Sequence, residues 1–131
     1  MSAVRYAVAA LLLAAGCHIG PQAKHHAPAL RATGASVTVT TAIGHISGEL
    51  LELRDTALVV LAAQVTLVPI RAIEQAAFSD TRLTMDRRYA LRPEEREELR
   101  LLGRYPYGIP AAAMAKLLAS RGQTSILVVD R

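Results

Sequence analysis

The stretch SVTVTTAIGHISGEL, residues 36–50, decides the fold of this chain. Its first half alternates valine with threonine, and its second half places apolar Ile46 and Leu50 on one face with polar residues on the other. A hydrophobic period of two is typical of strands that bury one face, so two β-strands are predicted here. Gly48, in the middle of the second strand, indicates strong bending or the close approach of another backbone.

Three further strands are predicted downstream, over Ala57–Leu61, Val65–Val68 and a short stretch near Glu74–Phe78. Pro69 ends the fourth strand because it has no N–H to donate, and one tight helical turn is expected over Pro69–Ile73. Five short, bent strands can bury one face by curling into a small barrel. The side chains expected to face inward are Ile46, Leu50, Leu58 and Val60.

Several segments of this region resemble known small barrels. The run Gly44–Leu53, the turn at Asp55, the strand Leu58–Leu61 and the sequence VPIRAI of residues 68–73 are similar to SH3-like and Sm-like barrels, including those of uncharacterised exported bacterial proteins. The resemblance implies a five-stranded barrel over residues 36–78. Nucleic-acid-binding Sm proteins carry an asparagine in the turn after the aspartate, whereas this chain has threonine and alanine there. No RNA-contact residue is carried over, and no nucleic-acid partner is expected.

Two short helices and a C-terminal strand are predicted after the barrel. Pro93 and Pro110 can each open a helix, since the N–H that proline lacks is one that a first helical turn leaves unpaired. Ile126–Val129 has no polar residue alternating with its apolar ones, which is typical of a strand buried on both faces. We therefore expect a helical hairpin plus strand over residues 91–131, packed on the barrel, so that residues 36–131 form a single α+β domain.

The first seventeen residues are typical of a targeting segment. Arg5 is followed by ten apolar residues, Tyr6–Ala15, which is the length of a signal-peptide core and too short to span a bilayer as a helix. The sequence LAAGC of residues 13–17 resembles the lipobox of bacterial lipoproteins, which implies a signal peptide over residues 1–16 and a lipid on Cys17. A plain secretory signal with an incidental cysteine is the alternative.

Residues 17–35 are expected to be the lipidated cysteine and a flexible tether, because they combine proline, glycine and alanine without periodicity. His18, not aspartate, follows the cysteine, which by analogy with Gram-negative sorting favours the outer membrane, facing the periplasm. His25 and His26 could bind a metal together with His18, but no carboxylate or thiolate assists them, and a solvated spacer is expected instead. No metal or cofactor is predicted.

The composition excludes several classes of protein. A chain of 131 residues is too short for a multidomain enzyme, and a single cysteine excludes both an internal disulfide framework and a cysteine-rich zinc site. Tryptophan is absent and phenylalanine occurs once, so the core must be built from leucine, isoleucine and valine. The net charge of +4 is by itself only a weak argument for an anionic partner.

His45 and Ser47 are the best candidates for catalysis, since residues two apart on a strand face the same way. Their spacing does not match the Gly-x-Ser-x-Gly turn of hydrolases, and no third group is implied. Metal ligation by His45 with Glu49 or Glu52 is a further alternative. No catalytic residue is therefore predicted.

Arg104, Tyr105 and Tyr107 are the predicted binding residues. Pro106 holds the two tyrosines apart in a short loop between the helices, where they offer flat, amphipathic area beside a guanidinium. Tyrosine and arginine are enriched in protein contact surfaces. The alternative is that the rings cover the core while the proline shapes the turn.

These observations predict a non-catalytic, lipid-anchored cell-envelope protein that serves as an interaction or assembly module. It would be held at the membrane through its N-terminal lipid and would contact another protein or an envelope polymer. Two alternatives stay open: a small envelope hydrolase or metal-dependent enzyme that uses His45, Ser47 and Glu49, and a domain that binds an anionic glycan through the excess of arginine.

Overall fold

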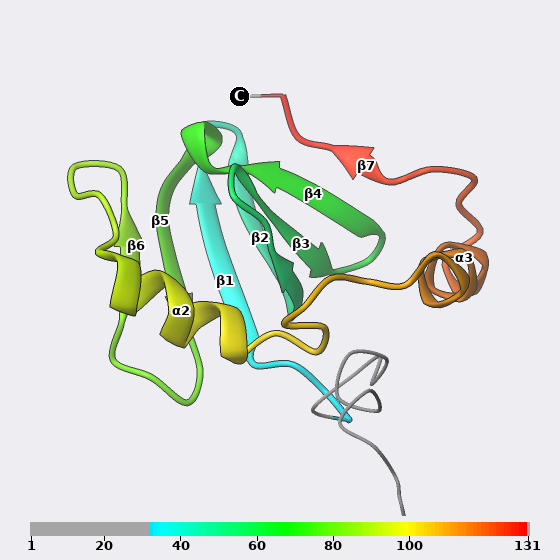
Figure 1. Cartoon of the computed structure of the whole chain (residues 1–131). Helices are drawn as coiled ribbons and strands as arrows, with labels where there is room; N and C mark the ends of the chain where they lie inside the picture. The colour runs from blue at the N-terminus through cyan, green and yellow to red at the C-terminus, as the bar shows by residue number, and fades with distance from the viewer. Residues whose placement is uncertain (1–31, 131) are drawn as a thin grey trace, which may run out of the picture.

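The computed structural model describes residues 32–130, which form a mixed β-sheet with two helices beside it (Figure 1). The predictions that fall on residues 1–31, namely the signal peptide, the lipid on Cys17 and most of the tether, lie outside the described residues. The α+β class predicted from the sequence is confirmed. No helix in the described range is long and apolar enough to cross a membrane.

Seven strands form one sheet in the order β6-β5-β1-β2-β3-β4-β7. Neighbouring strands are antiparallel, except that β7 runs parallel to β4. A 3-10 turn, η2 (Ile70–Ala72), joins β4 to β5 where a tight turn was predicted. The strands are β1 (Ser36–Thr41), β2 (Gly44–Leu53), β3 (Ala57–Leu61), β4 (Val65–Pro69), β5 (Ile73–Phe78), β6 (Thr84–Asp86) and β7 (Leu127–Val128).

The sheet is not closed into the predicted five-stranded barrel. The five predicted strands are present and adjacent in the sheet, but the edges of β4 and β5, which would have to meet, each pair with another strand. Gln123 brings the C-terminal segment to the β4 edge, because its side chain accepts a hydrogen bond from the Val65 N–H at 2.6 Å and donates one to the Val65 carbonyl at 3.1 Å. Because β6 and β7 already pair with the outer edges of β5 and β4, these two edges have no free backbone groups with which to pair with each other.

The C-terminal strand is shorter and more exposed than predicted. β7 has two residues, and both Leu127 and Val128 are about half-exposed, so the strand is not buried on both faces. Only the next residue, Val129, is buried, and its N–H donates to the Leu67 carbonyl at 3.0 Å. β7 is exposed because it lies at the edge of the sheet, where β4 is its one neighbouring strand.

The main hydrophobic cluster lies between one face of the sheet and helix α2 (Pro93–Leu101), which runs across that face in Figure 1. Leu99 of α2 is fully buried in it. The four side chains predicted to face inward, Ile46, Leu50, Leu58 and Val60, all belong to this cluster or pack against it. The predicted strand faces are therefore confirmed.

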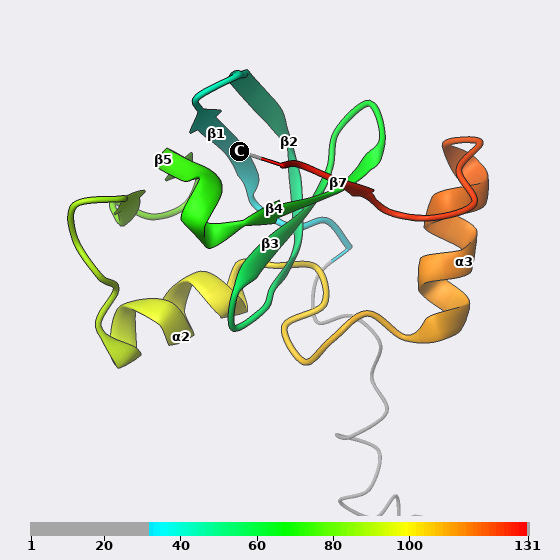
Figure 2. The same cartoon turned by 90° about the horizontal axis from the view of Figure 1, so that it is seen from above.

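A second cluster lies apart from the first and was not predicted. It gathers Leu51, Val59, Val65, Tyr105 and Leu117, the last from helix α3 (Ala111–Ser120). Figures 1 and 2 show α3 standing well away from α2, beside the β3–β4 side of the sheet. The predicted helical hairpin is wrong, because each helix covers a different cluster.

Strand β2 can contribute to both clusters because its backbone is irregular. Its pairing with β3 shifts between Leu50 and Glu52, which is a β-bulge. Leu50 and Leu53, three residues apart, therefore both reach the first cluster, while Leu51 reaches the second. Gly48 stands just before the bulge, and a Cβ there would lie 2.3 Å from the Leu61 carbonyl oxygen. The close backbone approach predicted at Gly48 is confirmed.

Candidate functional site

The predicted binding segment, Arg104–Tyr107, is attached through its backbone to the bulge of β2. The N–H of Arg104 donates to the Leu50 carbonyl at 3.1 Å, and the N–H of Tyr105 donates to the Leu51 carbonyl at 2.8 Å. The connection between the two helices is thus held like a short added strand.

Arg104 is committed to an ion pair with Glu49. Its Nε and one terminal nitrogen lie 2.8 Å and 2.6 Å from the two carboxylate oxygens, and the Gly34 N–H donates to the same carboxylate at 2.6 Å. Partial burial alone would raise the pKa of Glu49, but the hydrogen bonds from Arg104 and Gly34 outweigh it and lower that pKa. Arg104 therefore joins β2, the helix connection and the start of the fold, rather than offering a free charge.

Gly34 and Ala35 belong to the fold, although the predicted tether extends to residue 35. Ala35 is buried, its N–H donates to the Leu102 carbonyl at 2.9 Å, and its carbonyl accepts from the Leu50 N–H at 2.8 Å. A Cβ at position 34 would lie 1.9 Å from the Leu50 carbonyl oxygen, so only glycine fits there. The ordered domain thus begins before the first strand.

The two predicted tyrosines have opposite environments. Tyr105 is 8% exposed and packs in the second cluster, whereas Tyr107 is 66% exposed. The Arg100 guanidinium lies 5.0 Å from the centre of the Tyr107 ring, and it also donates to the Pro106 carbonyl at 2.8 Å and bonds to Glu97. Of the three predicted residues, Tyr107 alone presents a large free surface.

His45, Ser47 and Glu49, the residues of the catalytic alternative, each bond to a different neighbour. The His45 Nδ1 lies 3.2 Å from the Thr40 hydroxyl, and the Ser47 hydroxyl lies 3.2 Å from that of Thr38, so both side chains bond to β1 rather than to each other. The Glu49 carboxylate forms an ion pair with Arg104. Within residues 32–130, no three histidine, cysteine, aspartate or glutamate side chains gather closely enough to hold a metal ion.

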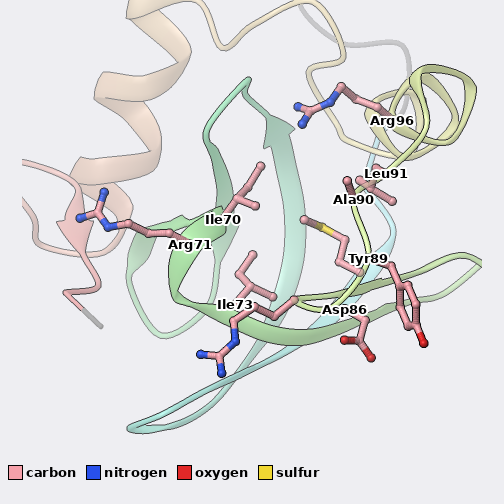
Figure 3. Close-up of a pocket in the computed structure, with 10 residues that line it drawn as sticks. Ile70, Arg71, Ile73, Asp86, Tyr89, Ala90, Leu91 and Arg96 are labelled. Atoms are coloured by element: carbon pink, nitrogen blue, oxygen red, sulfur yellow. The ribbon is translucent and has the colours of Figure 1, made fainter.

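The sequence did not predict a hollow of about 320 Å³ between β5, β6, η2 and the start of α2 (Figure 3). Ile73 and Met85 are buried members of the first cluster, and Ile70 and Leu91 pack against that cluster. Strand β6, which forms one wall, is three residues long and has one apolar side chain, Met85, so the sequence carries no period that would predict it.

A shallower groove of about 510 Å³ runs along α3 beside Arg104 and Tyr105. The rest of it is lined by Pro110 and by five residues of α3, namely Ala112, Ala113, Lys116, Leu117 and Ser120. Two of the predicted binding residues therefore do border a groove, but Tyr107 does not line it.

Comparison of the chain with protein-family models, with curated proteins and with solved structures finds no match.

Proposed function

We propose that this chain is a non-catalytic interaction module of the cell envelope, anchored by a lipid on Cys17, and that its contact surface is centred on Tyr107. The observation that carries the proposal is the Tyr107 ring itself, 66% exposed on a segment whose backbone and neighbouring side chains are bonded in place. A rigidly held ring loses little conformational entropy when a partner covers it.

The surroundings of Tyr107 support this proposal. Arg100 stacks on the ring and is held by the Pro106 carbonyl and by Glu97, so both residues keep one arrangement. Tyr105, buried two residues earlier, anchors the segment from beneath. Exposed tyrosine next to arginine is the composition that dominates the energetics of many protein interfaces.

The polar side chains of β2 support a non-catalytic function. His45 and Ser47 bond across to threonines of β1, as surface side chains of paired strands do. A hydrolase would need a base within reach of the Ser47 hydroxyl, whereas that hydroxyl bonds to the hydroxyl of Thr38.

We also propose that β1–β5 correspond to the five strands of an SH3-like or Sm-like barrel whose first and last edges are not joined. The consecutive order β5-β1-β2-β3-β4 and the 3-10 turn before β5 support it. In this proposal β6 and β7 are additions that keep the barrel open.

The anchor is tested by replacing Cys17 with serine in the cell of origin. The wild-type chain is expected in the membrane fraction, specifically the outer membrane, and the Cys17→Ser variant in the soluble fraction. Incorporation of a radiolabelled fatty acid should be lost in the same variant. A variant that stays in the membrane fraction with its precursor uncleaved would contradict the lipid anchor.

The contact surface is tested by crosslinking in envelope preparations. Tyr107→Ser is expected to abolish the crosslinked species that the wild type forms. The matched control is Ile43→Ser, which removes another exposed apolar side chain, 72% exposed, from the β1–β2 turn at the opposite end of the sheet. Loss of crosslinking in the control, or retention in Tyr107→Ser, would place the contact surface elsewhere.

A further inference from the structure

Half of the residues that line the hollow shown in Figure 3 are apolar, and the others are charged residues and Tyr89. Ile70 and Ile73 face it from one side, and Ala90 and Leu91 face it from the other. Met85 also lines it. Met85 and Ile73 are almost fully buried, so the floor of the hollow is the uncovered end of the first cluster. An alkyl chain needs no hydrogen-bond partner, so it can lie on this aliphatic part of the lining.

One of the charged residues that line this hollow is the cation Arg96. Figure 3 shows Arg96 extending from α2 toward Ile70. Among the described residues the Arg96 side chain makes one hydrogen bond, to the Asp55 carbonyl at 3.1 Å, and no ion pair. Its remaining N–H donors are available to a ligand.

The other charges around the hollow favour an anion as well. The Asp86 carboxylate points away from the hollow in Figure 3 and is held by Arg88, with nitrogen–oxygen distances of 3.0 and 2.8 Å. Arg87 also lines the hollow, and its side chain has no ion-pair partner in the described part of the chain. Arg71 is likewise unpaired there, although in Figure 3 it points away from the cavity.

We propose that this hollow binds a short aliphatic carboxylate, with the alkyl chain on Ile70, Met85 and Leu91 and the carboxylate on Arg96. A guanidinium pairs with a carboxylate through two parallel hydrogen bonds. The volume, about 320 Å³, is at the small end of the range for ligand sites, which suits a fatty acid of medium length. This site is separate from the Tyr107 surface and does not depend on it.

The chain supplies its own reporters for a test. Met85 lines the hollow, whereas Met114 packs against the second cluster, so methyl-labelled methionine gives a signal from the site and a signal from elsewhere in the domain, beside that of Met1. Octanoate titrated into the full chain carrying Cys17→Ser is expected to shift the Met85 methyl resonance saturably and to leave that of Met114 unchanged. Octanamide, which has the same chain without the charge, should need at least tenfold higher concentration.

Arginine variants test where the carboxylate sits. Arg96→Gln is expected to weaken octanoate binding about tenfold and to leave octanamide binding unchanged. Arg121→Gln, at an exposed arginine beyond α3, is the matched control and should change neither. An unchanged Met114 resonance in each variant reports an intact fold, and Tyr107→Ser should bind octanoate as the wild type does.

Three results would overturn the proposal: a Met85 resonance that ignores millimolar octanoate, equal responses to octanoate and octanamide, and octanoate binding that Arg96→Gln does not weaken. A shift of Met114 as large as that of Met85 would show non-specific uptake and would also overturn it. None of these results bears on the Tyr107 surface, which has its own test.

Discussion

Tyr105 and Tyr107 are separated by one proline, yet one ring is 8% exposed and the other 66% exposed. The difference arises because the Tyr105 N–H bonds to the β2 bulge at Leu51, which draws that ring into the second cluster. The two tyrosines therefore differ in role: Tyr105 anchors the loop, whereas the Tyr107 ring is exposed.

Alanine at each tyrosine should separate these effects. Tyr105→Ala removes a buried aromatic side chain and is expected to lower the free energy of unfolding by about 3 kcal/mol or more. Tyr107→Ala loses an exposed stacking contact with Arg100 and should cost less than about 1 kcal/mol. Urea denaturation followed by circular dichroism measures both. Equal losses would contradict the different burial of the two rings.

Substitutions of Leu58 and Thr38 test which side chains of the strands face the core. Leu58 is fully buried in the first cluster, so Leu58→Ala is expected to cost about 2–5 kcal/mol. Thr38 is exposed, and within residues 32–130 its hydroxyl bonds to that of Ser47 alone, so Thr38→Ala should stay within about 0.5 kcal/mol. Chemical denaturation of both variants should show this contrast, and similar losses would mean that the strand faces are reversed.

At the level of elements, β2 connects parts of the chain that are distant in sequence. Its bulge accepts hydrogen bonds from the segment between α2 and α3, and its Glu49 carboxylate binds both Arg104 and the Gly34 N–H. One strand therefore positions the start of the fold, the helix connection and the Tyr107 surface. A substitution of Glu49 should therefore affect the start of the fold, the helix connection and the Tyr107 surface.

Glu49→Gln should destabilise the protein in a pH-dependent manner. At pH 7 the variant leaves Arg104 without its counter-charge, which is expected to cost about 1–3 kcal/mol. Because the folded-state pKa of Glu49 lies below its ordinary value of 4.5, the ion pair stabilises the fold fully above pH 4.5. That stabilisation is lost as the pH falls through the folded-state pKa.

The measurement is the free energy of unfolding of wild type and variant from pH 7 downward. The difference between them should be constant above pH 5 and shrink below pH 4.5. Glu97→Gln, which breaks an exposed pair with Arg100, is the control and should leave stability nearly unchanged. A difference that grows on acidification would contradict the direction of the pKa shift.

At the level of the whole molecule, the domain has two separate hydrophobic clusters, each covered by its own helix. Leu99 is the buried residue of α2, and Leu117 is the buried residue of α3. Since the two helices share no cluster, packing changes in one should not be transmitted to the other. A helical hairpin would couple them directly.

A double-mutant cycle tests this separation. Leu99→Val and Leu117→Val each remove one methylene from a buried position and should each cost about 1 kcal/mol. The double variant is expected to lose the sum of the two within about 0.5 kcal/mol, as distant sites do. Thermal or chemical denaturation of the four proteins gives the coupling energy, and a value above about 1 kcal/mol would show that the clusters communicate.

The amino-acid sequence by itself determined the local features of this protein. The alternation in residues 36–50 predicted two strands and their buried faces, Pro69 predicted the turn before β5, and Gly48 predicted a close backbone contact. Pro93 marked the start of α2. These features follow from residues near each other in the chain, whose side-chain period and backbone restrictions act locally.

Only the tertiary structure decided how the elements assemble. The Arg104–Glu49 pair joins residues 55 positions apart, and the Gln123–Val65 pair joins residues 58 positions apart. Those contacts attach the C-terminal segment to the β4 edge and the helix connection to β2, and no local pattern encodes them. Which strand edge a segment covers depends on where the rest of the chain has already folded, because an edge offers the same N–H and C=O groups to any segment that reaches it.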